Sequence, residues 1–154
     1  MSTKVTLRDA RRDEVPAIVA MLADDKLGAV REVTTEPLPA SYYAAFDALA
    51  LDANNRLLIA EKNGEIVGTL QITFIVGLSR RGAKRALLEA VRVAAPHRGK
   101  GIGAEIVRAA VEIARHEGCA MVQLTTDKSR HDAHRFYERL GFTASHEGMK
   151  LMLK

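Results

Sequence analysis

The sequence predicts a mixed α/β fold in which helices flank a mostly antiparallel central sheet. Strand-like and helix-like stretches follow each other along the 154 residues in the order β-α-α-β-β-β-α-β-α-β-β. Asn63-Gly64 stands between two apolar stretches and is the strongest short-range signal for a β-hairpin. Further on, a strand over 87–93 runs into a glycine-rich loop and then into an amphipathic helix.

The elements before the glycine-rich loop follow from local patterns. Their predicted ranges are strand 5–8, helix 13–23, a short helix over 26–31, helix 41–52, and strands 57–60, 66–76 and 87–93. Residues 5–8 alternate apolar and polar side chains, and Asp13 offers an N-cap to the helix that follows. Residues 77–86 form a basic connection, which makes the strand over 87–93 antiparallel to its predecessor if the connection is a hairpin.

The elements after the loop begin with a helix over 104–118, for which Gly118 is a suitable stop. Its expected buried face consists of Ile106, Val107, Ala110, Ile113 and Ala114. A strand over 121–125 and a helix over 131–140 follow. Residues 142–144 then start a strand, and 149–153 form the strand that closes the sheet.

Length and composition indicate one domain spanning residues 1–154, with 47% hydrophobic and 27% charged residues. The net charge of +4 suits an anionic ligand but does not by itself indicate nucleic acid. A lone cysteine excludes an internal disulfide framework, and no stretch has the length of a membrane span. We therefore expect a soluble, cytoplasmic protein that binds neither membranes nor nucleic acid.

The glycine-rich loop predicts a site for an anionic group such as a phosphate. Backbone N–H groups of Gly99, Gly101 and Gly103 lack intrahelical partners at the start of a helix, whose dipole favours negative charge there. Arg98 and Lys100 add positive charge. The spacing fits neither a P-loop nor the dinucleotide fingerprint, and an ordinary strand-to-helix turn is the simpler alternative.

Two motifs resemble those of the GNAT superfamily of N-acetyltransferases. Arg98-x-x-Gly101-x-Gly103 is similar to its motif A, and residues 134–142, HRFYERLGF, are similar to its motif B. The resemblance covers essentially the whole chain and implies a GNAT fold that binds acetyl-CoA. The cofactor-binding residues that it implies are Val91, Arg92, Val93, Arg98, Gly99, Lys100, Gly101, Ile102, Gly103 and Arg130.

The same resemblance implies two catalytic residues. Glu89 lies where several members carry a general base, although an ion pair with Arg85 or Arg92 is the alternative. Tyr137 of motif B would protonate the CoA thiolate as general acid, and a purely core role is its alternative. In the superfamily the motif-B helix often carries an asparagine at the position that Arg130 occupies in this chain. The contact usually assigned to that asparagine is therefore expected from Ser129 or Arg130.

The expected reaction is direct transfer of acetyl from acetyl-CoA to a primary amine of a small molecule. Residues 124–137 are also similar to bacterial aminoalkylphosphonate N-acetyltransferases, which makes an anionic amine worth considering. The basic connection over 77–86 could face such an anion, or could be solvated surface. The five histidines and Cys119 show no metal-ligand spacing, so no metal site is expected.

Three alternatives to small-molecule acetylation remain open from the sequence. A protein lysine or N-terminus could be the acceptor, or the chain could bind CoA without catalysis. A basic nucleic-acid-binding domain is disfavoured by the absence of tryptophan and by an aromatic content of 5%. Because dimers are common in the superfamily that the chain resembles, a homodimer is also expected.

Overall fold

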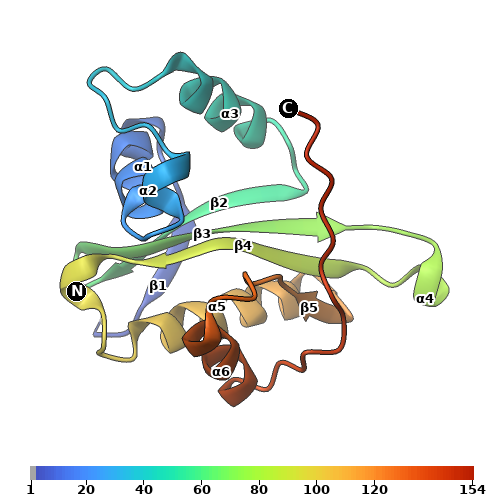
Figure 1. Ribbon diagram of the computed structural model, residues 1–154. Coiled ribbons are helices and arrows are strands. Elements are labelled where there is room, and N and C mark those ends of the chain that lie inside the picture. The colour runs from blue at the N-terminus through green and yellow to red at the C-terminus, as the bar shows by residue number, and fades with distance from the viewer. Residues whose placement is uncertain (1–2) are drawn as a thin grey trace. The chain divides into compact units, whose positions relative to one another are not determined.

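The computed structural model describes residues 3–154, and its largest element is a five-stranded sheet in the order β1-β2-β3-β4-β5 (Figure 1). The strands are β1 (Thr6–Asp9), β2 (Asn55–Lys62), β3 (Glu65–Ile75), β4 (Arg85–Val93) and β5 (Met121–Gln123). Strands β1 to β4 pair antiparallel, and β5 pairs parallel with β4. The predicted mixed, mostly antiparallel sheet is confirmed.

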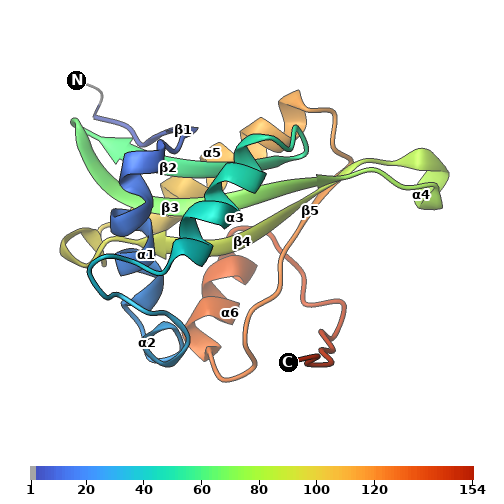
Figure 2. The ribbon, with the colours of Figure 1, turned by 90° about the horizontal axis from the view of Figure 1, so that it is seen from above.

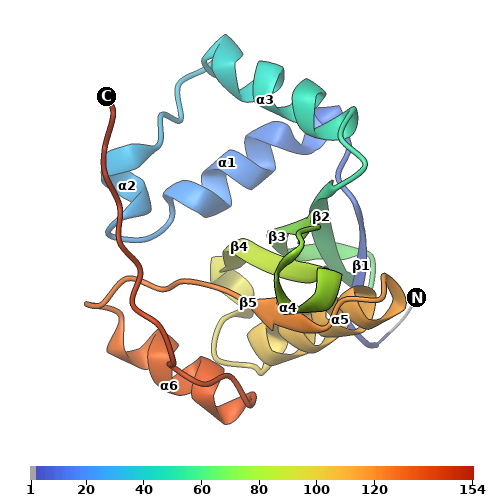
Figure 3. The ribbon, with the colours of Figure 1, turned by 90° about the vertical axis from the view of Figure 1, so that its right-hand side faces the viewer.

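The chain divides into two compact units, one of them ending at Gln123 and the other spanning Leu124–Lys154. The first unit contains the whole sheet and most of the helices. Its helices are α1 (Val15–Ala23), α2 (Gly28–Arg31), α3 (Ala40–Ala50) and α5 (Ile102–His116), with short turns η1 (Arg12–Glu14), η2 (Ala95–His97) and α4 (Ser79–Gly82). Helices α1 and α3 lie over one face of the sheet, and α5 covers the other (Figure 3).

The helices on both faces of the sheet explain the apolar run in β2. Leu58, Ile59 and Ala60 are all fully buried, as expected for a central strand with helices on both sides. Helix α5 supplies Ile106, Val107, Ala110 and Ala114 to the core, which confirms four positions of the predicted stripe, whereas Ile113 is only half-buried.

The connection between β3 and β4, residues 76–84, projects from the end of the sheet and carries α4 (Figure 2). Arg80 and Arg81 adopt φ of 55° and 60° there, so α4 is a tight turn rather than a regular helix. The antiparallel pairing of Ile75 with Arg85 confirms that the basic connection is a hairpin. Val76 and Leu78 next to the turn are exposed.

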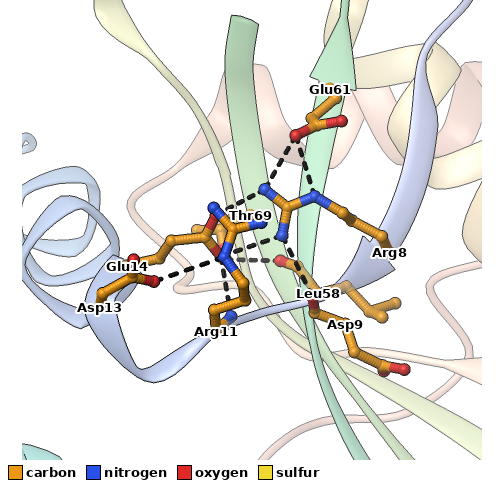
Figure 4. Close-up of polar contacts among 8 residues, drawn as sticks. All are labelled: Arg8, Asp9, Arg11, Asp13, Glu14, Leu58, Glu61 and Thr69. Atoms are coloured by element: carbon orange, nitrogen blue, oxygen red, sulfur yellow. Dashed lines mark hydrogen bonds and ion pairs between the residues drawn. The ribbon is translucent and has the colours of Figure 1, made fainter. Parts of the chain in front are cut away.

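The entry into α1 differs from the prediction, because Asp13 is not the N-cap. Asp13 lies within η1, and Glu14 turns inward, where its carboxylate accepts a 2.8 Å hydrogen bond from the Arg11 N–H. The Arg8 guanidinium contacts Glu14 at 2.5 Å and Glu61 at 2.8 Å (Figure 4). The partner for the buried carboxylate, Arg8, comes from β1, six residues earlier in the chain.

The second unit contains α6 (His131–Arg139), which confirms the predicted helix. Gly141, with a φ of 96°, follows its end. The strands predicted over 142–144 and 149–153 are not formed in this chain. A strand needs a neighbour for its backbone N–H and C=O groups, and residues 142–154 join no ladder within the described residues.

Candidate functional site

Strands β4 and β5 pair along only the first part of β4. The two strands pair from Arg85–Met121 to Leu87–Gln123, whereas β4 continues to Val93 against β3 alone. Over the described residues, β4 therefore has a strand on only one side from Leu88 onward. An open strand edge presents N–H and C=O groups to which an extended ligand can bond as an added strand.

A bulge interrupts β4 at the beginning of this open edge. Gln71 pairs with Glu89 and Thr69 pairs with Arg92, so two residues of β4, Ala90 and Val91, lie opposite one residue of β3. Ala90 has a φ of 53°, a left-handed conformation that costs a non-glycine residue on the order of 1 kcal/mol. Such strain persists where the surrounding structure enforces it and often marks functional sites.

Glu89 directly precedes the bulge and is exposed. Its expected alternative partner, Arg92, instead contacts Asp25, with 3.3 Å between Nε and Oδ2. Within residues 3–154, the Glu89 carboxylate forms an ion pair with neither Arg92 nor Arg85. The ion-pair interpretation of Glu89 is therefore wrong, and its carboxylate is accessible to a substrate.

The glycine-rich loop has the backbone geometry of an anion cradle. Gly99 and Gly101 have φ of 74° and 78°, a region that glycine enters without steric cost. The first helical hydrogen bond of α5 runs from the Glu105 N–H to the Gly101 carbonyl. The N–H groups of Ile102, Gly103 and Ala104 precede it and have no acceptor within the helix.

The two cations of the loop differ in their contacts. Arg98 donates from Nε to the Val93 carbonyl at 3.1 Å and from Nη2 to Asp24, at 3.1 Å to its carbonyl and 3.2 Å to its carboxylate. Lys100 is exposed and lines a cavity of about 220 Å³ with Lys62, Asn63, Glu65, Val67, His97 and Ile102. Ile102 is buried, whereas Lys100 next to it is exposed.

Asp24 and Asp25 are functional candidates that the sequence pattern did not reveal. Asp24 forms an ion pair with Arg98, and Asp25 forms one with Arg92. The two arginines lie at opposite ends of the segment that leads from β4 into the loop. The adjacent pair of acids after α1 was a visible signal, but its partners are more than sixty residues away along the chain.

In the second unit, Tyr137 is half-buried among aromatic rings. Its ring packs edge-on against Phe136, at 5.0 Å between centroids, and against Phe142, at 5.7 Å. An open hollow of about 520 Å³ lies at the beginning of α6, lined by Ser129, Arg130, His131, Asp132, Ala133 and Arg135. Its lining includes Ser129 and Arg130, the two candidates for the contact that the resemblance assigns to an asparagine of the motif-B helix.

The remaining candidate site residues are structural or surface groups. Lys84 of the basic connection contacts Glu117 at 3.3 Å, whereas Arg80 and Arg81 are exposed. His134 contacts the Asp127 carbonyl at 3.2 Å, as expected for a hydrogen-bonding histidine. Burial raises the pKa of the Cys119 thiol, which disfavours the nucleophilic thiolate.

Two other kinds of feature, a metal centre and a membrane span, are lacking in the part of the chain that the structure describes. Over 3–154, no group of three or more His, Cys, Asp or Glu side chains is arranged to hold a metal ion. In the same range, no helix combines the length and the apolar character needed to cross a membrane.

With this geometry established, comparison with known proteins identifies the family. The sequence matches the acetyltransferase (GNAT) family over residues 18–142. The chain belongs to this family. The resemblance carried by the two motifs is thereby confirmed, and so is the fold class.

Individual relatives of this GNAT chain support the assignment. It is 38% identical over 101 residues to an aminoalkylphosphonate N-acetyltransferase of Salmonella typhimurium, a match that covers 66% of this chain and 65% of that enzyme. It is 32% identical over 93 residues to a glucosamine 6-phosphate N-acetyltransferase of Trypanosoma brucei brucei, covering 60% and 61%. The chain thus spans somewhat less than two thirds of the length of each.

Solved structures match almost the whole chain. A protein described as a transcriptional regulator from Bacillus halodurans C-125 is 50% identical, with a TM-score of 0.92 and coverage of 97% of this chain and 99% of that one. A putative acetyltransferase from Agrobacterium tumefaciens is 27% identical, with a TM-score of 0.79 and coverage of 96% and 99%.

Proposed function

We propose that residues 1–154 form one cytoplasmic N-acetyltransferase domain that transfers acetyl from acetyl-CoA directly to a primary amine of a small molecule. The observation that carries the proposal is the open edge of β4, which begins at the Ala90 bulge beside Glu89 and leads into the glycine-rich loop. Relatives named as N-acetyltransferases support it.

The chain fits acetyl-CoA at two places along this path. The backbone of Val91, Arg92 and Val93 offers an edge to the pantetheine arm, with its alternating amide groups. The loop from Arg98 to Gly103 offers backbone N–H groups and a helix N-terminus to the pyrophosphate. A Cβ added to Gly99 or Gly101 would have no atom within 4 Å, so the loop has open space in front of it. Arg130, with Ser129, is the proposed contact from the second unit.

Bound acetyl-CoA supplies an activated acetyl group as a thioester. Glu89 accepts a proton from the ammonium form of the acceptor, directly or through a water molecule, and leaves a neutral amine that can attack the carbonyl carbon. As the new C–N bond forms and the C–S bond breaks, Tyr137 donates its phenolic proton to the departing sulfur. The nitrogen loses its surplus proton through solvent, and the resulting phenolate of Tyr137 takes up a proton again. The transfer needs no acyl-enzyme, and Cys119 has no role in it.

We infer that the acceptor amine carries a phosphonate or phosphate group. Two relatives are named for acceptors of that kind, an aminoalkylphosphonate and glucosamine 6-phosphate. The exposed guanidinium groups of Arg80 and Arg81 supply two cations that could meet such an anion. A panel of amines with and without a phosphonate or phosphate group tests this inference, and equal kcat/KM values for matched pairs would contradict it.

Thermal unfolding with acetyl-CoA tests the cofactor site. At a hundredfold excess over Kd, a ligand of the native state stabilises it by about 2.7 kcal/mol, which raises Tm by about 5–10 °C for a chain of this size. Gly101→Glu should abolish the rise, because it puts a negative charge at the cradle.

Gly118→Glu is the matched control for that experiment. Gly118 has a φ of 76°, and a Cβ added there would also have no atom within 4 Å, so both substitutions carry the same backbone strain in equally open space. The control should unfold at a lower temperature yet keep the full acetyl-CoA-induced rise. Absence of any rise in the parent chain at saturating acetyl-CoA would contradict the proposed function.

Glu89→Gln should lower kcat about 100-fold and leave the rise in Tm with acetyl-CoA unchanged. This loss is at the lower end of what a general base contributes, because solvent reaches the exposed side chain and partly replaces it. Glu112→Gln is the control, since Glu112 pairs only with Arg115 of its own helix among the contacts described. Equal kcat values for both variants would exclude Glu89 as the base.

A further inference from the structure

One face of the sheet lies toward α1 and α3, and the strand register identifies the residues on it (Figure 3). Side chains alternate between the two faces along a strand, and directly paired residues point to the same face. Ile59 of β2 belongs to the face toward α1, because it shares a core cluster with Ile18 and Met21 of that helix. Its partner in β3, Thr69, therefore points the same way, and so do the odd-numbered residues of β3 that follow.

Glu89 and Arg85 of β4 lie on this same face. Glu89 pairs with Gln71 of β3, and Arg85 pairs with Ile75. The bulge in β4 comes after Glu89, so the alternation from Arg85 to Glu89 is regular. The proposed base and an arginine thus point to the same side of one strand, with one residue of that face, Leu87, between them.

A hydrogen-bond network fixes polar groups beside this stretch of β4. The Asn55 carbonyl oxygen accepts a hydrogen bond of 3.2 Å from the Gln71 amide and one of 2.7 Å from the Thr73 hydroxyl. Gln71 and Thr73 belong to the same face of β3 and lie directly across from the stretch between Arg85 and Glu89. The face that carries the proposed base is therefore polar across three strands.

Arg85 is half-buried and carries an unsatisfied donor. Within residues 3–154, its guanidinium Nε is buried and has no hydrogen-bond partner. A buried cationic donor without an acceptor costs folding free energy, and such a group calls for an explanation. Arginine is also the side chain that binds phosphate oxygens through two parallel hydrogen bonds. The guanidinium groups of Arg80 and Arg81, by contrast, are exposed in the turn, where water satisfies them.

We propose that Arg85 binds the phosphonate or phosphate group of the acceptor whose amine gives its proton to Glu89. The inference rests on the proposed acetyl transfer and names the residue that selects the acceptor. At a rise of about 3.3 Å per residue, the Cα atoms of Arg85 and Glu89 are about 13 Å apart. Side chains that stand perpendicular to the sheet keep this separation, and hydrogen bonds of about 3 Å at both ends leave about 7 Å for the acceptor. A small molecule with its amine a few bonds from the anionic group has this length.

Calorimetric titration with aminoethylphosphonate, in the presence of saturating CoA, tests the role of Arg85 without turnover. Arg85→Met removes the charge and the donors, and should raise Kd about 10–100-fold, since hydrogen bonds between charged groups are lost. Arg85→Met should unfold at the parent temperature or above, because it also removes the unsatisfied buried donor. An arginine that served only the fold would instead lower Tm and leave Kd unchanged.

Arg56→Met is the matched control, because Arg56 is also a half-buried strand arginine. It pairs with Ile72, an even-numbered residue of β3, and so points to the opposite face, where it contacts Asp9 at 2.9 Å. This variant should bind aminoethylphosphonate with the Kd of the parent chain. If Arg85→Met fails to fold, Arg85→Lys replaces it. That variant keeps the charge but loses the paired donors, and should raise Kd about 10-fold.

Steady-state kinetics separates this inference from the proposed function. With aminoethylphosphonate, Arg85→Met should raise KM about as much as Kd and leave kcat unchanged, and with ethanolamine it should change neither constant. A chain that binds the phosphonate through Arg85 but transfers no acetyl supports the assignment of Arg85 and contradicts the proposed function. Equal Kd values for the parent chain and the folded Arg85 variant, or no binding to the parent chain, overturn the role of Arg85 even if acetyl transfer is observed.

Discussion

Tyr137→Phe is expected to lower kcat about 1,000-fold and to leave acetyl-CoA binding unchanged. The substitution removes only the hydroxyl, which is the proposed proton donor to the departing thiolate, and general acid catalysis contributes on the order of 10²–10⁴-fold. The half-buried position of Tyr137 leaves little access for water to replace the lost donor. Steady-state kinetics with acetyl-CoA and the best amine of the panel give kcat, and thermal unfolding reports binding.

The ring itself should tolerate the change. Phe keeps the edge-on contacts that Tyr137 makes with Phe136 and Phe142, so a loss of kcat would reflect the hydroxyl rather than the packing. Tyr43→Phe is the matched control, because the Tyr43 ring lies 4.8 Å below the Arg12 guanidinium and keeps that contact without its hydroxyl. If kcat of Tyr137→Phe stays within about threefold of the Tyr43→Phe value, Tyr137 is not the general acid.

The features that could be predicted from the sequence are those encoded within a few neighbouring residues. Asn63-Gly64 forms the predicted turn because both residues enter positive φ, at 54° and 78°. The glycine-rich loop follows a strand and starts a helix for the same local reason. These features, with the element order, were enough to indicate the family.

Contacts between distant segments could not be predicted in the same way. The Ala90 bulge arises from the register between β3 and β4, and an alanine at position 90 does not indicate a bulge. Asp24 and Asp25 meet Arg98 and Arg92 only after α1 packs near the end of β4. The strand over 149–153 has the right pattern, but a strand also needs a neighbour, and a sequence pattern does not identify one.

Glu14→Gln is expected to lower the free energy of unfolding by about 3 kcal/mol at pH 7. Removal of one partner from a buried ion pair typically costs about 3–5 kcal/mol, because the other charge stays behind without compensation. The lower end applies here, since the Arg8 side chain is 29% exposed and keeps Glu61 at 2.8 Å. Urea unfolding measures the change, which corresponds to a fall in Tm of roughly 6–12 °C.

Glu61→Gln is the matched control, because both carboxylates contact the same Arg8 (Figure 4). The Glu61 side chain is 33% exposed and that of Glu14 only 7%. Glu14 also contacts the backbone N–H and the guanidinium of Arg11, so burial and these added contacts distinguish the two carboxylates. Exposed ion pairs contribute about 0–1 kcal/mol, and Glu61→Gln should cost no more than that. Equal losses in the two variants would show that burial of Glu14 does not set its contribution.

The pH dependence gives the same interaction a second test. Hydrogen bonding to Arg8 lowers the pKa of Glu14 below its ordinary value, against the opposing effect of burial. A carboxylate with a lowered pKa in the folded state stabilises the protein fully above its unfolded pKa, about 4.3, and loses this contribution as the pH falls through the folded pKa. The difference in unfolding free energy between the parent and Glu14→Gln should therefore be constant from pH 7 to about 5 and shrink below about pH 4. A difference that stays constant down to about pH 3 would mean that the Glu14 charge is not what stabilises the fold, and that shape and hydrogen bonding alone account for the loss.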